Sequence, residues 1–294
     1  MNKGKMEFEE DPLQEIPPDD IHHLLATLKK DFPRSIHVYS FITILLKWKE
    51  KIDHYPIKIF APGGNYKNGA IFFYIIFNCR LDGTLYTWTE EGKVLLAKSI
   101  TETKRIQWFK YKIMFTGMPE DTWNAIEPLT KQMWKSHGIK FRTSLDKVFW
   151  LPSSLAKEIQ IITPEGFQLG NLKEEHAELI NNLWPHKHSE SFKLIINTIN
   201  YNFGLGVFDK NNHLVAWALY WFYGGIGSVH TVSEHRRKGL GKMVVNAITK
   251  KLGDLGIDVH LNVLRGNMTG ESFFESIGFL HAYNGLWAYS QPDK

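Results

Sequence analysis

The stretch HRRKGLGKMV, residues 235–244, decides how the C-terminal half of the chain is interpreted. It combines basic side chains with two glycines, then becomes apolar at the i, i+3, i+4 spacing of a half-buried helix that starts near Gly239. The first amides of a helix lack partners, and glycine lets an anion reach them. The stretch predicts a phosphate or pyrophosphate site. The same residues are also compatible with a plain strand-to-helix turn whose basic side chains are solvated. The residues of the predicted site are Arg236, Arg237, Lys238, Gly239, Leu240, Gly241 and Lys242.

Spacing excludes two other phosphate-binding loops. A Walker A loop would need glycine where Arg236 stands and serine or threonine where Met243 stands. A dinucleotide fingerprint would need a third glycine at the position of Val244. Neither a P-loop nor a dinucleotide-binding loop is therefore expected.

The neighbouring segments place the loop between two strands. GGIGSVHTV (224–232) precedes it, and IDVHLNV (257–263) follows the helix, which we expect Gly253 to end in a left-handed cap. Further upstream, the Asn-rich turn KNNH (210–213) lies between two segments of β-type composition and predicts a hairpin. The other expected elements of this half are a strand at 167–169 and helices over 172–184 and 189–200.

Two motifs in this order resemble the GNAT acyltransferase superfamily, whose first motif wraps the pyrophosphate of coenzyme A (CoA). The first is R-x-x-G-x-G after a strand, and the second is an Asn, a short helix and Gly-Phe within NMTGESFFESIGF (267–279). The resemblance covers residues 165–289. With a chain near 300 residues long, it extends to the glycine N-acyltransferase family, which joins acyl groups from acyl-CoA to glycine or related amino acids. The residues that carry the match are Arg236, Gly239, Gly241, Asn267, Gly278 and Phe279.

The resemblance implies an α/β chain of tandem GNAT-like architecture, in which helices flank a mixed central sheet. We expect a degenerate N-terminal half, over residues 19–158, and a CoA-binding C-terminal half, over residues 159–294. Residues 1–18 are expected to form a flexible acidic tail. Alternating β-rich and helical runs in the N-terminal half agree with a mixed α/β domain.

Composition excludes several classes of protein. The chain has 294 residues, 43% of them hydrophobic, and a net charge of +4, which is unlike a disordered protein or a dedicated nucleic-acid binder. Its most apolar windows are too short to span a membrane. Acidic N-terminal letters do not form a presequence, so we expect the cytoplasm, although the family resemblance would also allow mitochondria. The one cysteine, Cys79, is expected to be a buried reduced thiol.

The resemblance also assigns roles near the predicted thioester. The main chain of Val229, His230, Thr231 and Val232 would hold the pantetheine arm and supply an oxyanion donor. Asn267 and Phe274 would complete the CoA site. Phe274 stands where many superfamily members carry a tyrosine that protonates the leaving thiolate.

The sequence offers two candidates for the base. Gly225 aligns with the glutamate that glycine-conjugating enzymes use as a base. His230 could accept a proton at neutral pH, because an imidazole has a pKa near 6.5, and Glu234 is the carboxylate alternative. His260 and Asn262 could orient the acceptor, or have packing or surface roles. The alternatives are a pocket or core imidazole without acid–base duty for His230 and a solvated or capping role for Glu234.

Other signals are weaker. His186 and His188 have a spacing compatible with metal binding, but no carboxylate cluster or further cysteine completes a site, so no metal is expected. Trp184, Trp217 and Trp221 could line an acyl or acceptor pocket or belong to the core.

The sequence predicts an N-acyltransferase that moves an acyl group from acyl-CoA or acetyl-CoA to a small amine, such as glycine or another amino acid. We expect no nucleic-acid or membrane partner. Two alternatives stay open, a catalytically weak CoA-binding module and a protein or peptide N-acetyltransferase.

Overall fold

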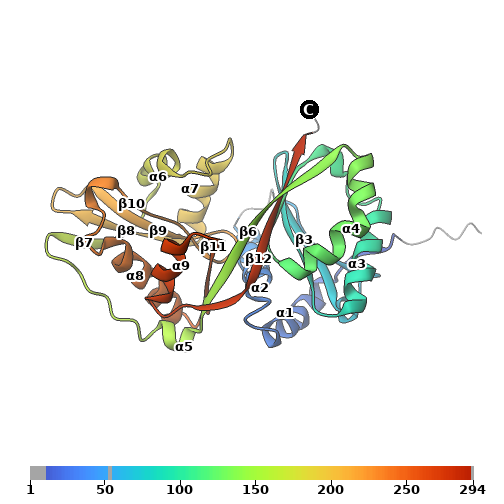
Figure 1. Cartoon of the computed structure of the whole chain (residues 1–294), viewed down its shortest axis with the longest axis horizontal. Helices are drawn as coiled ribbons and strands as arrows, with labels where there is room; N and C mark the ends of the chain where they lie inside the picture. The colour runs from blue at the N-terminus through green and yellow to red at the C-terminus, as the bar shows by residue number, and fades with distance from the viewer. Residues whose placement is uncertain (1–10, 52–54, 293–294) are drawn as a thin grey trace, which may run out of the picture. The chain divides into compact units, whose positions relative to one another are not determined.

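The computed structural model describes residues 11–51 and 55–292, which form two compact units. The first unit holds the described residues up to Thr27, Pro56–Thr143 and the residues from Leu286 onward. The second holds Leu28–Tyr55, apart from residues 52–54, and Ser144–Gly285. Each unit consists of a mixed sheet with flanking helices, as the sequence predicts (Figure 1).

The two units do not follow the expected bounds of 19–158 and 159–294. Helix α2 (Ile36–Lys49) belongs to the second unit, where its Trp48 Nε1 donates to Asn202 Oδ1 at 2.9 Å. The end of strand β12 (Leu280–Pro292) belongs to the first unit, where the amide of Ile113 donates to Ser290 Oγ at 2.7 Å. Contacts between segments far apart in the sequence therefore set the division.

The first unit contains a sheet in the order β1-β2-β3-β4-β5. Strands β1 to β4 pair antiparallel, and β4 pairs β5 in parallel over Arg80–Gly83. Helices α3 (Glu90–Glu102) and α4 (Glu120–Ser136) pack together beside this sheet (Figure 1). The strands are β1 (Leu13–Glu15), β2 (Ile57–Pro62), β3 (Ala70–Phe77), β4 (Arg80–Thr87) and β5 (Lys112–Pro119), and α1 spans Ile21–Lys30.

Part of the expected flexible tail is ordered. Residues 13–15 form β1, and the Asp11 carboxylate accepts hydrogen bonds from the amides of Leu13 and Lys104. Residues 1–10 of that tail lie outside the described residues. Cys79 was expected to be buried, but it lies exposed in the turn between β3 and β4, where Asn78 takes a positive φ of 53°.

The second unit contains a sheet in the order β6-β11-β10-β9-β8-β7. The predicted hairpin is confirmed as β8 and β9, and the strands on either side of the glycine loop are β10 and β11, which run parallel. The strands are β6 (Ile139–Leu151), β7 (Phe167–Asn171), β8 (Phe203–Asp209), β9 (Leu214–Tyr220), β10 (Ile226–Thr231) and β11 (Val259–Leu264).

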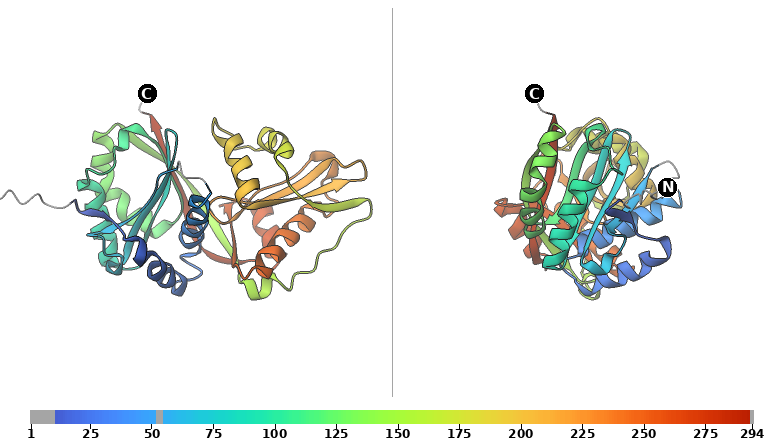
Figure 2. Two further views of the ribbon diagram at one scale, coloured as in Figure 1. Left: turned by 180° about the vertical axis from the view of Figure 1, so that it is seen from behind. Right: turned by 90° about the vertical axis from the view of Figure 1, so that its right-hand side faces the viewer.

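Helices cover both faces of this second sheet. Helix α8 (Leu240–Asp254) lies on one face, and α6 (Ala177–Leu183) and α7 (Ser191–Tyr201) lie on the other, as Figure 2 shows from behind. The short helices α5 (Ser153–Ala156) and α9 (Met268–Glu275) complete the unit. The apolar stripe predicted for α8 is buried, and Leu240, Val244 and Ile248 are at most 1% exposed.

Gly253 does not end α8, contrary to the expected left-handed cap. The helix continues to Asp254, and the positive φ of 70° belongs to Gly256. Gly253 is instead a packing position, because a Cβ built on it would lie 2.3 Å from the Lys157 amide nitrogen and 2.7 Å from the Ala156 carbonyl carbon. Glycine therefore lets α8 approach the backbone of α5 closely.

Gly253→Ala should destabilise the protein, although the same change in an exposed helix interior usually stabilises by about 1 kcal/mol. The added methyl would collide with main-chain atoms, and overpacking of this kind costs about 1–3 kcal/mol. Urea unfolding followed by circular dichroism measures the difference. Gly241→Ala in the first turn of the same helix is the control, since its Cβ would meet side-chain atoms alone, Thr231 Oγ1 at 3.3 Å and Phe273 Cζ at 4.0 Å. Equal stability of the two variants would contradict this explanation.

Candidate functional site

The glycine loop ends where α8 begins, as the sequence predicts. Gly239 is the N-terminal cap of this 15-residue helix and has a φ of 80°, and no side chain caps its first amides. Arg237 also takes a positive φ, of 61°. Positive φ values at positions so close together turn neighbouring N–H groups toward one side, which is the geometry of anion-binding backbone concavities. A Cβ on Gly239 would meet nothing within 4 Å, so the backbone there is open to a ligand.

The basic side chains around the loop are available to an anion. Arg236, Arg237, Lys238 and Lys242 are exposed, and none of them pairs with a carboxylate in an ion pair within the described part of the chain. Arg236 Nε donates to the Thr231 carbonyl at 3.1 Å, so this side chain ties the loop to the end of β10. The loop, the open helix end and the basic side chains therefore lie together in an arrangement that could hold an anion.

Strand β10 carries a bulge directly before this loop. Gly227 faces Leu219 of β9 and His230 faces Trp217, so three residue steps on β10 match two on β9. The extra residue lies at Ser228 and Val229, and Ser228 has a φ of 51°, which residues other than glycine rarely adopt. A bulge leaves main-chain groups without a ladder partner.

On its other side, β10 leaves its neighbour. Within the described residues, β10 pairs with β11 at Ile226 and Leu261 and at no later position. From the bulge to Thr231, the edge of β10 on the β11 side therefore has no described strand paired with it. Main-chain donors and acceptors are obligatory hydrogen-bonding groups, so an edge of this kind suits an extended ligand.

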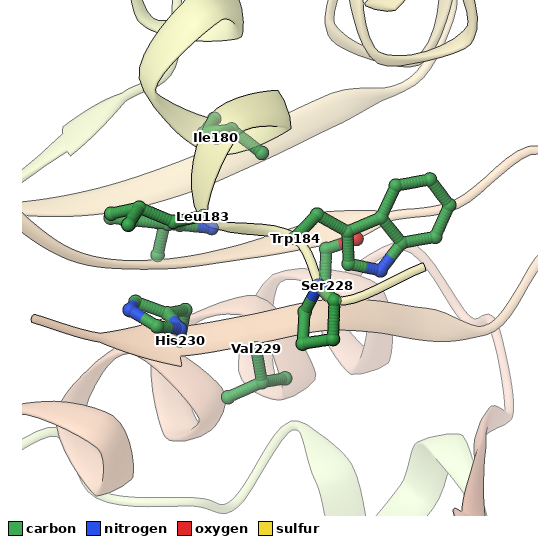
Figure 3. A pocket seen from close by; sticks show the side chains of 8 residues that line it. Ile180, Leu183, Trp184, Ser228, Val229 and His230 are labelled. Carbon is green, nitrogen blue, oxygen red and sulfur yellow. The ribbon is translucent and has the colours of Figure 1, made fainter. Parts of the chain in front are cut away.

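A small cavity of about 30 Å³ lies against the bulge, on the face of the sheet that α6 covers (Figure 3). Figure 3 shows Leu183 and Trp184 at the end of α6 above His230 of β10. The cavity has room for about two water molecules and is mainly apolar. Its lining residues are Ile180, Leu183, Trp184, Pro185, Trp217, Ser228, Val229 and His230.

His230 is the titratable group of this cavity. Its ring stacks on Trp217 with centroids 4.8 Å apart and an angle of 24° between the planes. Burial lowers the pKa of His230 below its ordinary value, and the charge of Arg236 lowers it further. The imidazole is therefore neutral at pH 7 and able to accept a proton.

Gly225, where the family resemblance expects a glutamate base, has no room for one. A Cβ there would lie 2.9 Å from Tyr223 Cε2 and 3.1 Å from His260 Nε2. His260 is fully buried, and its ring makes an edge contact with His37 of α2 at 5.4 Å. The space near Gly225 is thus filled by a neutral imidazole, since burial lowers the pKa of His260 to about 3.

The remaining predicted residues have structural duties. The Val232 amide donates to the Val215 carbonyl at 3.0 Å, so this donor is not available to a ligand. Asn267 Oδ1 caps α9 by accepting from the Gly270 amide at 3.1 Å. Phe274 packs edge-on against Phe279. Glu234 is exposed and accepts from the Ser233 hydroxyl, and it does not line the cavity.

Two features of the site are not predicted from the sequence. Ser228 gives no local signal for a positive φ. Leu183 and Ile180 lie in the helix predicted over 172–184, and their contribution to a cavity depends on which strand lies opposite. Trp184 and Trp217 were named as possible pocket residues, and both line the cavity.

Comparison with known proteins covers both halves of the chain. Residues 204–288 match the FR47-like protein family, and residues 12–129 match a domain of unknown function, DUF5645. A Drosophila protein of known structure is 18% identical, with a TM-score of 0.84 over 97% of this chain and 100% of that chain. A tandem GNAT protein from the clavulanic acid biosynthesis pathway is 12% identical, with a TM-score of 0.52 over 96% of this chain and 100% of that one.

The chain has a tandem GNAT fold. A GCN5-related N-acetyltransferase from Kribbella flavida, 11% identical, also matches with a TM-score of 0.51 over 77% of this chain and 88% of its own length. At these identities the likeness concerns the fold. It confirms the fold predicted from the order of the two GNAT motifs.

The two GNAT units differ at the corresponding helix. In the first unit, β4, α3 and β5 form the same strand–helix–parallel strand arrangement as β10, α8 and β11. Thr89 caps α3, accepting from the Gly92 amide at 2.9 Å and donating to the Asn68 carbonyl at 3.1 Å. Glu90 and Glu91 begin the helix. The start of α3 is thus capped and acidic where that of α8 is open and basic.

The described residues contain no group of three His, Cys, Asp or Glu side chains arranged for a metal ion. Nor does any helix in that part of the chain combine the length and apolar character needed to cross a membrane.

Acid should destabilise the second unit through His260. The folded protein keeps this ring neutral down to about pH 3, whereas the unfolded chain protonates it near pH 6.5. Above about pH 6.5 the ring is neutral in both states, and the unfolding free energy does not depend on it. Below that pH the unfolding free energy decreases by about 1.4 kcal/mol per pH unit for one ring. Urea unfolding of the wild type and His260→Phe from about pH 7 to about pH 4 should give a shallower slope for the variant.

A control for that series is His213→Phe, because the His213 side chain is 73% exposed. Its slope should match the wild type. If all three proteins lost stability in parallel, His260 would not be the titrating group.

Proposed function

We propose that the protein is an acyl-CoA-dependent N-acyltransferase whose acceptor is a small amine, such as glycine or another amino acid. The observation that carries the proposal is the convergence of three features on β10. These are the bulge at Ser228, the parting from β11 after Ile226, and the open, basic start of α8. The match to the FR47-like family over 204–288 covers all three.

The residues present fit two parts of CoA, the pyrophosphate and the pantetheine arm. The pyrophosphate would lie at the open amides near Gly239, close to the exposed side chains of Arg236, Arg237 and Lys242. The pantetheine arm carries amide groups, and the unpaired edge of β10 offers the donors and acceptors that such groups need. The thioester would then lie at the bulge, next to the cavity.

The chemistry requires positioning, charge stabilisation and transfer of one proton. The acceptor nitrogen bonds to the thioester carbonyl carbon, the carbon–sulfur bond breaks, and the amide product and CoA thiol are released. Main-chain N–H groups of the bulge would stabilise the negative charge on the carbonyl oxygen. The proton that nitrogen loses passes to a base and finally to sulfur, which leaves readily as thiolate because thiols are acidic, as the pKa of about 8.5 of a cysteine side chain illustrates.

His230 is the base that the site supports best. It lines the cavity, it is neutral at pH 7, and its ring is held by Trp217. Glu234 lies outside the cavity, and Gly225 and Phe274 supply neither a carboxylate nor a hydroxyl. Those two residues are also the observation that favours the second candidate function, a CoA-binding module that has lost its catalytic groups.

We further propose that the first unit holds no second CoA. Besides its acidic first turn, the start of α3 is covered by the loop before β3. A Cβ built on Gly69 of that loop would lie 2.0 Å from the Thr89 hydroxyl, so the two segments are in tight contact. An incoming pyrophosphate would meet neither open amides nor positive charge there.

The function is tested by incubating the protein with a panel of acyl-CoAs and amines, including glycine and a peptide pool, and measuring released thiol and amide product. Gly239→Leu should abolish CoA binding in calorimetry and all turnover, because its side chain would occupy the open side of the loop. Gly256→Leu is the matched control, since Gly256 has a similar φ of 70° and equally open surroundings at the other end of α8.

Binding of CoA without turnover of any amine would favour the CoA-binding module. Turnover of peptides alone would favour a peptide N-acetyltransferase. Equal loss of CoA affinity in both glycine variants would contradict the assigned CoA site.

The pH profile tests His230 as the base. Its lowered pKa means that the neutral, active form persists to lower pH than for a free imidazole, so the acid limb of kcat/KM should lie below about pH 6.5. His230→Ala should lower kcat about 100-fold or more and remove that limb. Glu234→Ala is the control and should keep both rate and profile. An unchanged acid limb in His230→Ala would exclude His230 as the base.

A further inference from the structure

The cavity at the β10 bulge is placed to receive the acyl chain. If the proposed function holds, the thioester carbonyl is bound by the bulge, and the carbon chain attached to it must extend into whatever space adjoins Ser228 and Val229. The cavity described above is lined by both residues. Its far side is therefore the wall that an acyl chain would meet.

That wall consists of side chains from two elements. Ile180 is 0% exposed and Trp217 1% exposed, so both form a fixed floor. Leu183, in the last turn of α6, closes the outer side and is 40% exposed. Leu183 can therefore be changed without loss of a buried core contact.

Trp184 is held in place from several directions. Its ring makes an edge contact with Trp221 at 5.3 Å. The loop that follows it is fixed by Ser191, whose hydroxyl donates to the His188 carbonyl at 2.7 Å and also contacts Asn181 Oδ1 at 2.5 Å. Since Ser191 is fully buried, the end of α6 is anchored to the start of α7. The cavity cannot widen simply by moving this loop away.

The volume of the cavity limits the chain. About 30 Å³ holds about two water-sized groups. An acetyl group has one carbon beyond its carbonyl and a propionyl group has two, so both fit. A hexanoyl or benzoyl group would have to displace Leu183 or Ile180.

The chemistry of the lining limits the charge. Its side chains are aliphatic, aromatic or hydroxylic, apart from His230, which is neutral at pH 7. Arg236 is the cation near His230, but it is exposed, its Nε donates to the Thr231 carbonyl, and it does not line the cavity. A carboxylate at the end of the acyl chain would therefore lose its hydration without gaining an ion pair inside the cavity, which is strongly unfavourable. Malonyl and succinyl groups are therefore excluded on charge even where their length would be tolerated.

We propose that Leu183, with Ile180 and Trp217 behind it, determines acyl specificity and restricts the site to short, uncharged acyl groups of two or three carbons. This inference rests on the proposed acyltransferase function. It adds the class of acyl donor and the residue that sets its length.

The test compares acetyl-, propionyl-, butyryl-, hexanoyl-, benzoyl- and succinyl-CoA with one acceptor, measuring kcat/KM for each. Wild-type protein should prefer acetyl- and propionyl-CoA and lose about tenfold for each further methylene. Succinyl-CoA should be poorer than butyryl-CoA, which has the same number of carbons and no charge. Hexanoyl- or succinyl-CoA used as well as acetyl-CoA would overturn the proposal.

Leu183→Ala should relax the limit. Removing this outer wall should raise the ratio of hexanoyl to acetyl kcat/KM at least about tenfold. Leu179→Ala is the matched control, because Leu179 lies one turn earlier on α6, is 39% exposed and does not line the cavity. The same change of ratio in both variants would overturn the role of Leu183.

A binding measurement separates failure of this inference from failure of the proposed function. Unreactive S-ethyl-CoA and S-hexyl-CoA thioethers are titrated by calorimetry. Wild-type protein should bind the ethyl compound at least about tenfold more tightly, and Leu183→Ala should reduce that difference. If both thioethers bind equally, the length limit is wrong even where turnover occurs. If the predicted difference appears without any turnover, the length limit stands and the enzymatic function fails.

Discussion

The main-chain groups and the cavity of the proposed site depend on a break in the register of β10. One extra residue on β10, at Ser228 and Val229, changes its pairing with β9, and β10 leaves β11 after Ile226. A strand that kept its full ladder on both sides would have no main-chain groups left for a ligand. The bulge supplies those groups, and it directs His230 into the cavity beneath α6. The unusual φ of Ser228 is the local cost of that arrangement.

The same fold gives two different outcomes in the two units, and side chains decide which. In the first unit, β4 pairs with β5 over Arg80–Gly83, and the Thr89 side chain caps the start of α3. In the second, β10 pairs with β11 only at Ile226 within the described residues, and Gly239 leaves the start of α8 open. Topology alone therefore does not make a GNAT unit a CoA site. In the proposed function, local hydrogen bonding and charge at one helix end make that difference.

The sequence predicted the features that depend on residues close together in the chain. The helix start at Gly239 follows from a glycine and the apolar period after it, both of which act over a few residues. It failed where distant contacts decide. Gly253 looks like a helix cap, yet the backbone of α5 dictates glycine there. Ser228 carries no preference for its conformation, and α2 joins the second unit through contacts such as Trp48 with Asn202.

Hydrogen–deuterium exchange with and without CoA, read by mass spectrometry, tests the central claim that one opened strand and one open helix end form a single CoA site. Peptides covering residues 227–231 and 236–242 should gain protection when CoA is added, because its amides and phosphates would occupy their free N–H groups. A peptide covering residues 88–93, at the capped start of α3, should not change. Protection at 88–93, or unchanged exchange at 236–242, would contradict the claim.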